Sequence, residues 1–175
     1  MDKHDVLEID KDQISAFIPQ VEDQFFTDSA YAVLDENWVA KEGYKGFKNW
    51  LKFAGLQKWK RNWDCDNMAT SFKLYMQMLH AKYNPYSFTE RFKKVGTNGT
   101  NVESIAVGDI FYKINGDERR AHAINLLICA QPIYSRTKNE NWDKHELKKV
   151  YFEPENGHIV DLSEVEEASI WYASF

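Results

Sequence analysis

Cys65 and His122 are the residues of this sequence whose types and settings could carry chemistry together. Cys65 lies where a helix-like apolar pattern begins, and His122 opens a strand-like run, with a small alanine on each side. A cysteine attacks as its thiolate, and because the pKa of a free thiol is about 8.5, a nucleophilic cysteine needs help from its surroundings. The positive dipole end of a helix gives some help, and a histidine held opposite can take the proton. The pair predicts a nucleophile, Cys65, served by His122 as general base.

A third group should hold the imidazole in one tautomer, and it is usually a carboxylate or an amide on a neighbouring strand. Glu153 ends the strand-like run 150–152 and follows His122 by 31 residues, a separation that suits the next strand of a sheet. Asn125 is the weaker candidate, because three positions along a strand place it on the opposite face from His122. The expected site is therefore Cys65, His122 and Glu153.

Helices come first along the chain, and strands follow. Apolar residues spaced by three and four predict helices at 11–27, divided in two by Pro19, at 44–57 and at 66–83. Strand-like runs lie at 104–114, 122–130, 150–152, 158–162 and 169–175. Asn115-Gly116 predicts a hairpin turn, and 134–148 is expected to be a long surface connection. The order predicts an α+β fold in one domain over 1–175, with an N-terminal helical extension at 1–45 and a catalytic core at 46–175.

The composition narrows the classes of function. A chain of 175 residues with 43% hydrophobic residues fits one globular domain, and its net charge of -5 argues against a nucleic-acid partner. The segment 58–63 interleaves basic residues with Trp; we interpret it as a solvated connector, with a sugar, phosphate or nucleic-acid contact as the alternative. Two cysteines make no disulfide framework, and Cys129 is expected in the core. No run suits a signal peptide or a membrane span, so we expect a soluble protein, cytoplasmic or packaged in a particle.

Three short motifs, taken in order, resemble a known group. The segments 64–69, 122–125 and 152–155 are similar to motifs of papain-like and transglutaminase-like cysteine hydrolases, in particular to the papain-like protease domain at the C-terminus of certain fungal agglutinins. Glu155 stands where that group favours Gln. The resemblance covers roughly the last two thirds of the chain, from about Phe47 onward.

The resemblance implies a papain-like α+β fold, with the cysteine at a helix start packed on an antiparallel β-sheet. It also implies a cysteine peptidase or amidase, with Cys65 as nucleophile, His122 as general base and Glu153 as the orienting group. In that reaction the thiolate attacks a peptide or amide carbonyl and the amine leaves; the acyl group of the acyl-enzyme then passes to water, or to an amine if the activity is transglutaminase-like.

The resemblance also raises the questions of an oxyanion donor and of a cofactor. Papain-like enzymes use a Gln a few residues before the cysteine, together with the cysteine N–H. The candidates here are Gln57, eight residues upstream, and Asn62, three residues upstream, and neither matches that spacing. Asp64 and Asp66 flank the cysteine and disfavour a thiolate; either could cap the helix, or bind calcium as in some of the fungal relatives. No cysteine and histidine spacing fits zinc, and no other metal or cofactor is expected.

Another class of function stays open. A catalytically silent fold of this kind could serve for binding or as a component of a larger assembly with a protein partner. Exposed Trp59 and Trp63 and the irregular oxyanion donor would suit that role. A sugar-recognition module is a third hypothesis, motivated by the six Trp residues.

Overall fold

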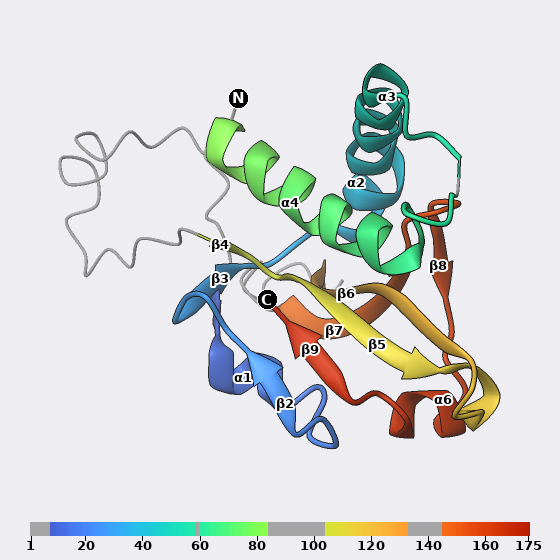
Figure 1. Ribbon diagram of the computed structural model, residues 1–175. Coiled ribbons are helices and arrows are strands. Elements are labelled where there is room, and N and C mark those ends of the chain that lie inside the picture. Colours follow the sequence, from blue (N-terminus) through green and yellow to red (C-terminus); the bar gives the residue numbers. More distant parts are fainter. Residues whose placement is uncertain (1–7, 59, 84–103, 133–144) are drawn as a thin grey trace, which may run out of the picture.

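The computed structural model describes residues 8–58, 60–83, 104–132 and 145–175 (Figure 1). Trp59 lies outside the described residues. Of the surface connection expected at 134–148, only 145–148 are described, and they belong to a strand. The helices are α1 (Lys11–Ser15), α2 (Glu36–Trp38), α3 (Tyr44–Ala54), α4 (Cys65–Tyr83) and α6 (Glu164–Ala168), with a π-helical turn at Val39–Gly43 and a 3₁₀ turn at Ile114–Gly116. The strands are β1 (Glu8–Asp10), β2 (Asp23–Phe25), β3 (Ala30–Ala32), β4 (Ser104–Ile105), β5 (Val107–Lys113), β6 (Ala121–Pro132), β7 (His145–Glu153), β8 (His158–Val160) and β9 (Tyr172–Ser174).

Two sheets organise these strands. The larger has six strands in the order β2-β9-β5-β6-β7-β8, and the smaller has three in the order β1-β3-β4. Pairing in the larger sheet is antiparallel except between β2 and β9, which are parallel. The β5–β6 hairpin sets Tyr112 opposite His122 and Asp109 opposite Asn125. Its turn uses Asn115 and Gly116, both at positive φ, as their sequence predicts.

Helix α4 crosses one face of the large sheet, with α3 beside it, whereas α1 and α6 lie on the opposite side (Figure 1). The core under α4 is aromatic. Phe72 is fully buried, stacks on Phe152 of β7 at 4.8 Å between ring centroids, and meets Phe47 of α3 edge-on at 5.2 Å. Aromatic pairs of this geometry add to the free energy that burial supplies, so they fix α4 over the sheet.

The opposite face of the sheet has its own core. Alternate residues of β6, namely Ile124, Leu126 and Ile128, are fully buried there. Residues of the N-terminal segment, among them Ile14 and Ile18, pack against them. Because β6 is covered on both faces, its sequence is a continuous apolar run rather than an alternating one.

The N-terminal part differs from the prediction, since helices do not dominate it. Helix α1 begins with a capping box between Asp10 and Gln13 but ends at Ser15, and 23–25 and 30–32 are strands. Pro19 is the physical reason, because it disfavours helical geometry in the residue before it and lacks an N–H. The chain turns tightly instead, with Val21 donating its N–H to the Ile18 carbonyl at 3.0 Å. From 16 to 35, turns and short strands therefore take the place of the expected helices, and helical geometry returns at Glu36.

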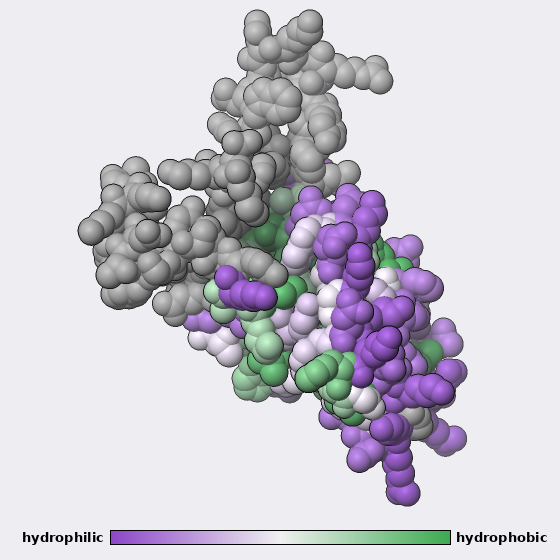
Figure 2. Space-filling view, turned by 90° about the horizontal axis from the view of Figure 1, so that it is seen from above, coloured by the Kyte–Doolittle hydropathy of each residue, from purple (hydrophilic) through white to green (hydrophobic). Residues whose placement is uncertain are grey.

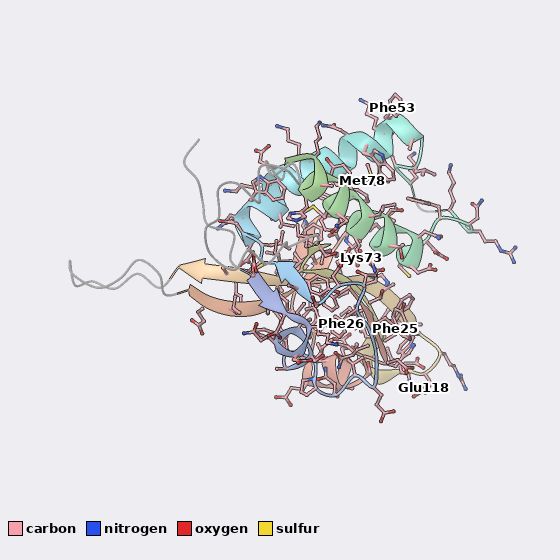
Figure 3. The ribbon with its side chains drawn as sticks, turned by 90° about the vertical axis from the view of Figure 1, so that its left-hand side faces the viewer. Phe25, Phe26, Phe53, Lys73, Met78 and Glu118 are labelled. Carbon is pink, nitrogen blue, oxygen red and sulfur yellow. The ribbon has the colours of Figure 1, made fainter. Side chains whose placement is uncertain are left out.

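The surface seen from the helix side is largely hydrophilic, with scattered apolar side chains (Figure 2). Three large apolar side chains of α3 and α4 are exposed: Phe53 at 94%, Leu74 at 56% and Met78 at 50%. Phe53 and Met78 lie on the outer side of the helices, whereas Lys73 lies toward the sheet (Figure 3). Among the described residues, no helix is long and apolar enough to cross a membrane.

Candidate functional site

Cys65 is the first residue of α4, so its side chain lies at the positive end of a 19-residue helix. The entry to the helix is capped by Asn67, whose side-chain oxygen accepts the Asp64 N–H at 3.3 Å. The two acids beside the cysteine are also engaged with each other. A hydrogen bond from Asp66, together with desolvation and the charge of Asp66, raises the pKa of the Asp64 carboxyl. The two carboxyl groups therefore lie close to each other beside the sulfur.

His122 joins Cys65 to Glu153. Its Nε2 lies 2.6 Å from the Oε2 of Glu153, and the two side chains are 20% and 11% exposed. The Cys65 thiol lies next to the imidazole, close enough to act on its pKa. These contacts, first that with Cys65 and then that with Glu153, raise the pKa of His122 to about 10 against the opposing effect of burial. The imidazole is therefore protonated at neutral pH, and Nε2 donates to the carboxylate.

Backbone groups of the β7–β8 turn hold Glu153. Its second oxygen, Oε1, accepts the N–H of Glu155 at 3.1 Å, and its carbonyl accepts the N–H of Gly157 at 2.8 Å. Gly157 has a φ of 78°, and a Cβ there would lie 2.0 Å from the ring of Tyr44. The tight turn therefore needs glycine, and it fixes the carboxylate at the end of β7.

Two tyrosines border this cluster. Tyr112 faces the His122 ring edge-on at 5.7 Å between centroids. Burial, and then the negative charges of Glu166, Glu153 and Cys65, raise the pKa of Tyr112 to about 12. Tyr44 of α3 donates its hydroxyl to the Glu155 carbonyl at 3.3 Å. The place of Tyr112 beside the cluster could have been predicted from the expected hairpin, because the hairpin register sets Tyr112 opposite His122. No sequence signal pointed to Tyr44.

The structure thus brings together Cys65, His122 and Glu153, which we call the Cys65 cluster. It does not bring in the two oxyanion candidates. Gln57 and Asn62 both have exposed side chains between α3 and α4, and within the described residues no hydrogen bond joins either to the cluster.

The remaining sequence candidates lie elsewhere. Cys129 is fully buried on β6, and burial, chiefly, raises the pKa of its thiol to about 12. Trp63 is partly buried and packs against the core under α4. Among the described residues, no group of three His, Cys, Asp or Glu side chains is placed to hold a metal ion. A calcium role for Asp64 or Asp66 stays a prediction.

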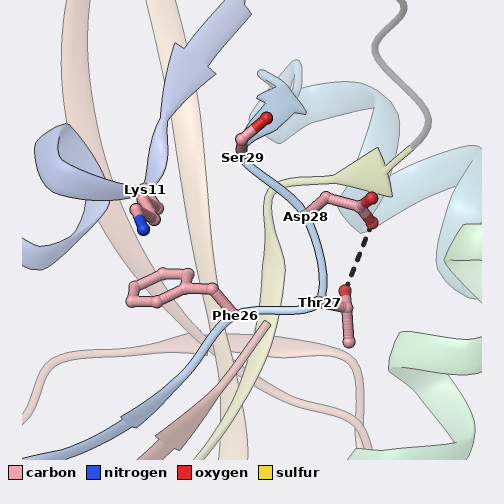
Figure 4. Close-up of a pocket in the computed structure, with 5 residues that line it drawn as sticks. All are labelled: Lys11, Phe26, Thr27, Asp28 and Ser29. Atoms are coloured by element: carbon pink, nitrogen blue, oxygen red, sulfur yellow. Dashed lines mark hydrogen bonds between the residues drawn. The ribbon is translucent and has the colours of Figure 1, made fainter.

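A separate open hollow of about 490 Å³ lies at the N-terminal segment (Figure 4). It is lined by Lys11, Phe26, Thr27, Asp28 and Ser29. Thr27 donates its hydroxyl to Asp28 at 3.3 Å, so part of its polar lining is already engaged. No residue of the Cys65 cluster lines this hollow.

Comparison with known proteins gives likenesses of fold. No protein-family model and no curated protein matches the sequence. Two solved structures are similar. One is described as a complex of PSL1a with E64, with a TM-score of 0.60, 17% identity, and coverage of 97% of this chain and 51% of that one. The other is Polyporus squamosus lectin bound to the human-type influenza-binding epitope Neu5Acα2-6Galβ1-4GlcNAc, with a TM-score of 0.59, 17% identity, and coverage of 97% and 50%. This chain spans about half the length of each.

These likenesses correct the family prediction. Motifs around Cys65, His122 and Glu153 resemble papain-like and transglutaminase-like cysteine hydrolases, whereas the similar solved structures are those of a lectin. The predicted papain-like fold class is replaced by the fold that this chain shares with half of the lectin chain, in which strands outnumber helices. The predicted cysteine hydrolase, of peptidase or amidase type, and its peptide substrate are likewise not retained, because the similar solved structures are those of a lectin.

Proposed function

We propose that this chain is a binding protein whose ligand is held at the Cys65 cluster. The observation that carries the proposal is the His122 imidazole, which is hydrogen-bonded to the Glu153 carboxylate and lies beside the Cys65 thiol. Neither an inert core cysteine nor a surface histidine needs such an arrangement. A histidine whose pKa is strongly raised by its neighbours, as that of His122 is, marks a candidate functional site.

The chemistry of the cluster suits an electrophilic or anionic ligand. A protonated imidazole next to a sulfur favours the thiolate, and the start of α4 adds its positive dipole. The thiolate can form a carbon–sulfur bond to an electrophilic carbon of the ligand, while the leaving group departs with the bonding electron pair. An anionic ligand group would instead interact with the imidazolium directly.

Alkylation by iodoacetamide between pH 5 and pH 10 tests the proposal, with glutathione as the reference thiol and the site of reaction read by peptide mass; the fully buried Cys129 should stay unlabelled while the protein is folded. In each reaction a carbon–sulfur bond forms and iodide leaves. We expect Cys65 to react at pH 6 at least about tenfold faster than the exposed thiol of glutathione, because a free thiol is mostly protonated there. His122→Ala should remove this advantage, and Cys65→Ala should remove the label. A Cys65 that gains rate only above pH 8, with or without His122, would refute the proposal.

A second candidate function is recognition of a glycan, and the fold shared with a glycan-bound lectin favours it. The chain offers aromatic side chains for such a contact. Phe25 and Trp171 are 56% and 40% exposed, and Tyr172 lies at 5.5 Å from the Phe25 ring. Flat aromatic faces with nearby polar groups are common in small-molecule sites.

Titration with Neu5Acα2-6Galβ1-4GlcNAc, followed by calorimetry, tests this candidate. We expect binding that Trp171→Ala weakens at least about tenfold, as the loss of an aromatic anchor does. Phe53→Ala is the matched control, since Phe53 is 94% exposed on α3 and should leave the affinity unchanged. The same affinity in both variants, or no heat of binding at millimolar glycan, would remove the candidate.

A further inference from the structure

Asn125 is a fully buried amide on β6, three residues beyond His122. Its side-chain nitrogen lies 2.9 Å from the carbonyl of Ala69 in α4. The same nitrogen lies 3.3 Å from the Gly108 carbonyl and 3.2 Å from the Oδ1 of Asp109, both in β5. One side chain therefore donates hydrogen bonds to a helix and to a neighbouring strand at once.

The helix it reaches is the one that begins with Cys65. Ala69 follows Cys65 by four residues, which is about one helical turn. The strand that carries Asn125 is the one that carries His122. The amide therefore joins the element of the sulfur to the element of the imidazole, although it touches neither group.

Neighbouring polar contacts brace the same part of the helix. The Lys73 ammonium of α4 lies 3.1 Å from the Asp109 carboxylate and donates to the Ser174 carbonyl of β9 at 3.1 Å. Thr70 of α4 donates to Asp109 at 3.4 Å. These directional hydrogen bonds thus fix the distance of this half of α4 from the sheet and its position along the helix axis. Aromatic packing, which is less directional, fixes them less strictly.

An apolar residue at position 125 would be expected to give a more stable fold than Asn125 does. Its side-chain oxygen is buried with no hydrogen-bond partner among the described residues, and an unsatisfied buried acceptor destabilises a fold. An apolar residue of similar shape would avoid that loss. The amide is better explained by the geometry that its N–H groups impose.

We propose that Asn125 is a positioning residue, which holds the first turns of α4 against β6 so that the Cys65 sulfur lies within reach of the His122 imidazole. The inference rests on the proposed function of the Cys65 cluster. It assigns a role in that site to a residue that neither contacts the ligand nor titrates.

Asn125→Leu tests the proposal, because leucine has a similar volume and no donor. Leu127→Ala is the matched control, since Leu127 lies two residues further along the same face of β6 and is 1% exposed. The measured quantity is the rate of iodoacetamide alkylation at Cys65 from pH 5 to pH 10. We expect Asn125→Leu to lower the rate at pH 6 by about tenfold or more, and Leu127→Ala to change it by less than about threefold, because loss of alignment costs more than loss of packing.

The possible results distinguish the proposed function of the Cys65 cluster from the positioning role of Asn125. If wild-type Cys65 lacks the enhanced rate, the proposed function fails. If wild-type Cys65 has it and Asn125→Leu keeps it, or if Leu127→Ala loses as much, only the positioning role is overturned. Asn125→Ala removes the same donors without adding a branched side chain, and replaces the leucine variant if that one unfolds without cooperativity. If neither variant folds, Asn125 is a residue of the folding core and the positioning role is overturned.

Discussion

The pH dependence of stability should report the charge on His122. Its pKa is raised in the folded protein, so its contribution to the free energy of unfolding is complete below pH 6.5 and is lost as the pH rises through about 10. The change from 6.5 to about 10 corresponds to an upper limit of about 5 kcal/mol, at about 1.4 kcal/mol for each pH unit. Solvent still reaches 20% of the imidazole side chain, so we expect about 2 kcal/mol.

Urea unfolding followed by tryptophan fluorescence at pH 6, 7, 8, 9 and 10 measures this contribution. His122→Gln cannot take up the proton, so its stability should be about 2 kcal/mol below that of the wild type at pH 6, and the two should converge toward pH 10. His158→Gln is the control, since the His158 side chain is exposed on β8, and it should keep the wild-type profile. Parallel profiles for the wild type and His122→Gln would refute a protonated His122 held by Cys65 and Glu153.

Two further predictions concern the contacts of α4 and use the same unfolding measurement. Phe72→Ala should lower the free energy of unfolding by about 3–5 kcal/mol, because it empties a fully buried aromatic site, whereas Phe53→Ala on the exposed face of α3 should change it by less than about 0.5 kcal/mol. Lys73→Met should cost about 3 kcal/mol, because it leaves the Asp109 carboxylate buried without its cation. Asp109→Asn should cost less, because burial raises the pKa of Asp109 despite Lys73 and the charged form is thus disfavoured in the fold; equal losses in the two variants would contradict this.

The Cys65 cluster could be predicted because each member ends a regular element with a strong local signal. Helix α4 follows from apolar residues at positions such as Met68, Phe72 and Met76, which are all buried, and β6 follows from a long apolar run. Cys65 begins the helix, His122 lies at the start of β6 and Glu153 ends β7, so pairing of β6 with β7 beneath α4 can bring the three side chains together. Glu153 required only the expectation that β7 pairs next to β6, as it does.

The N-terminal strands could not be predicted in the same way. Strand β2 at 23–25 pairs with β9 at 172–174, and strands this short and distant carry little periodicity. The oxyanion candidates Gln57 and Asn62 rested on the resemblance to papain-like enzymes and matched its spacing poorly, and their side chains are exposed between α3 and α4. Three short motifs were also too little to predict the fold, because the same catalytic residue types recur on unrelated folds. The likeness of fold to the solved structures exists at only 17% sequence identity.

The charge on His122 also bears on what the cluster can do. A pKa of about 10 means that the ring is an imidazolium at neutral pH, and an imidazolium has two N–H donors and no lone pair with which to accept a proton. Glu153 takes one of these donors at 2.6 Å, which leaves the other for the Cys65 sulfur or for a ligand atom beside it. In the resting protein His122 is thus a fixed positive charge and a hydrogen-bond donor. Such a group stabilises negative charge on a sulfur or on a bound ligand, which is the property that a binding site for an electrophilic or anionic ligand requires.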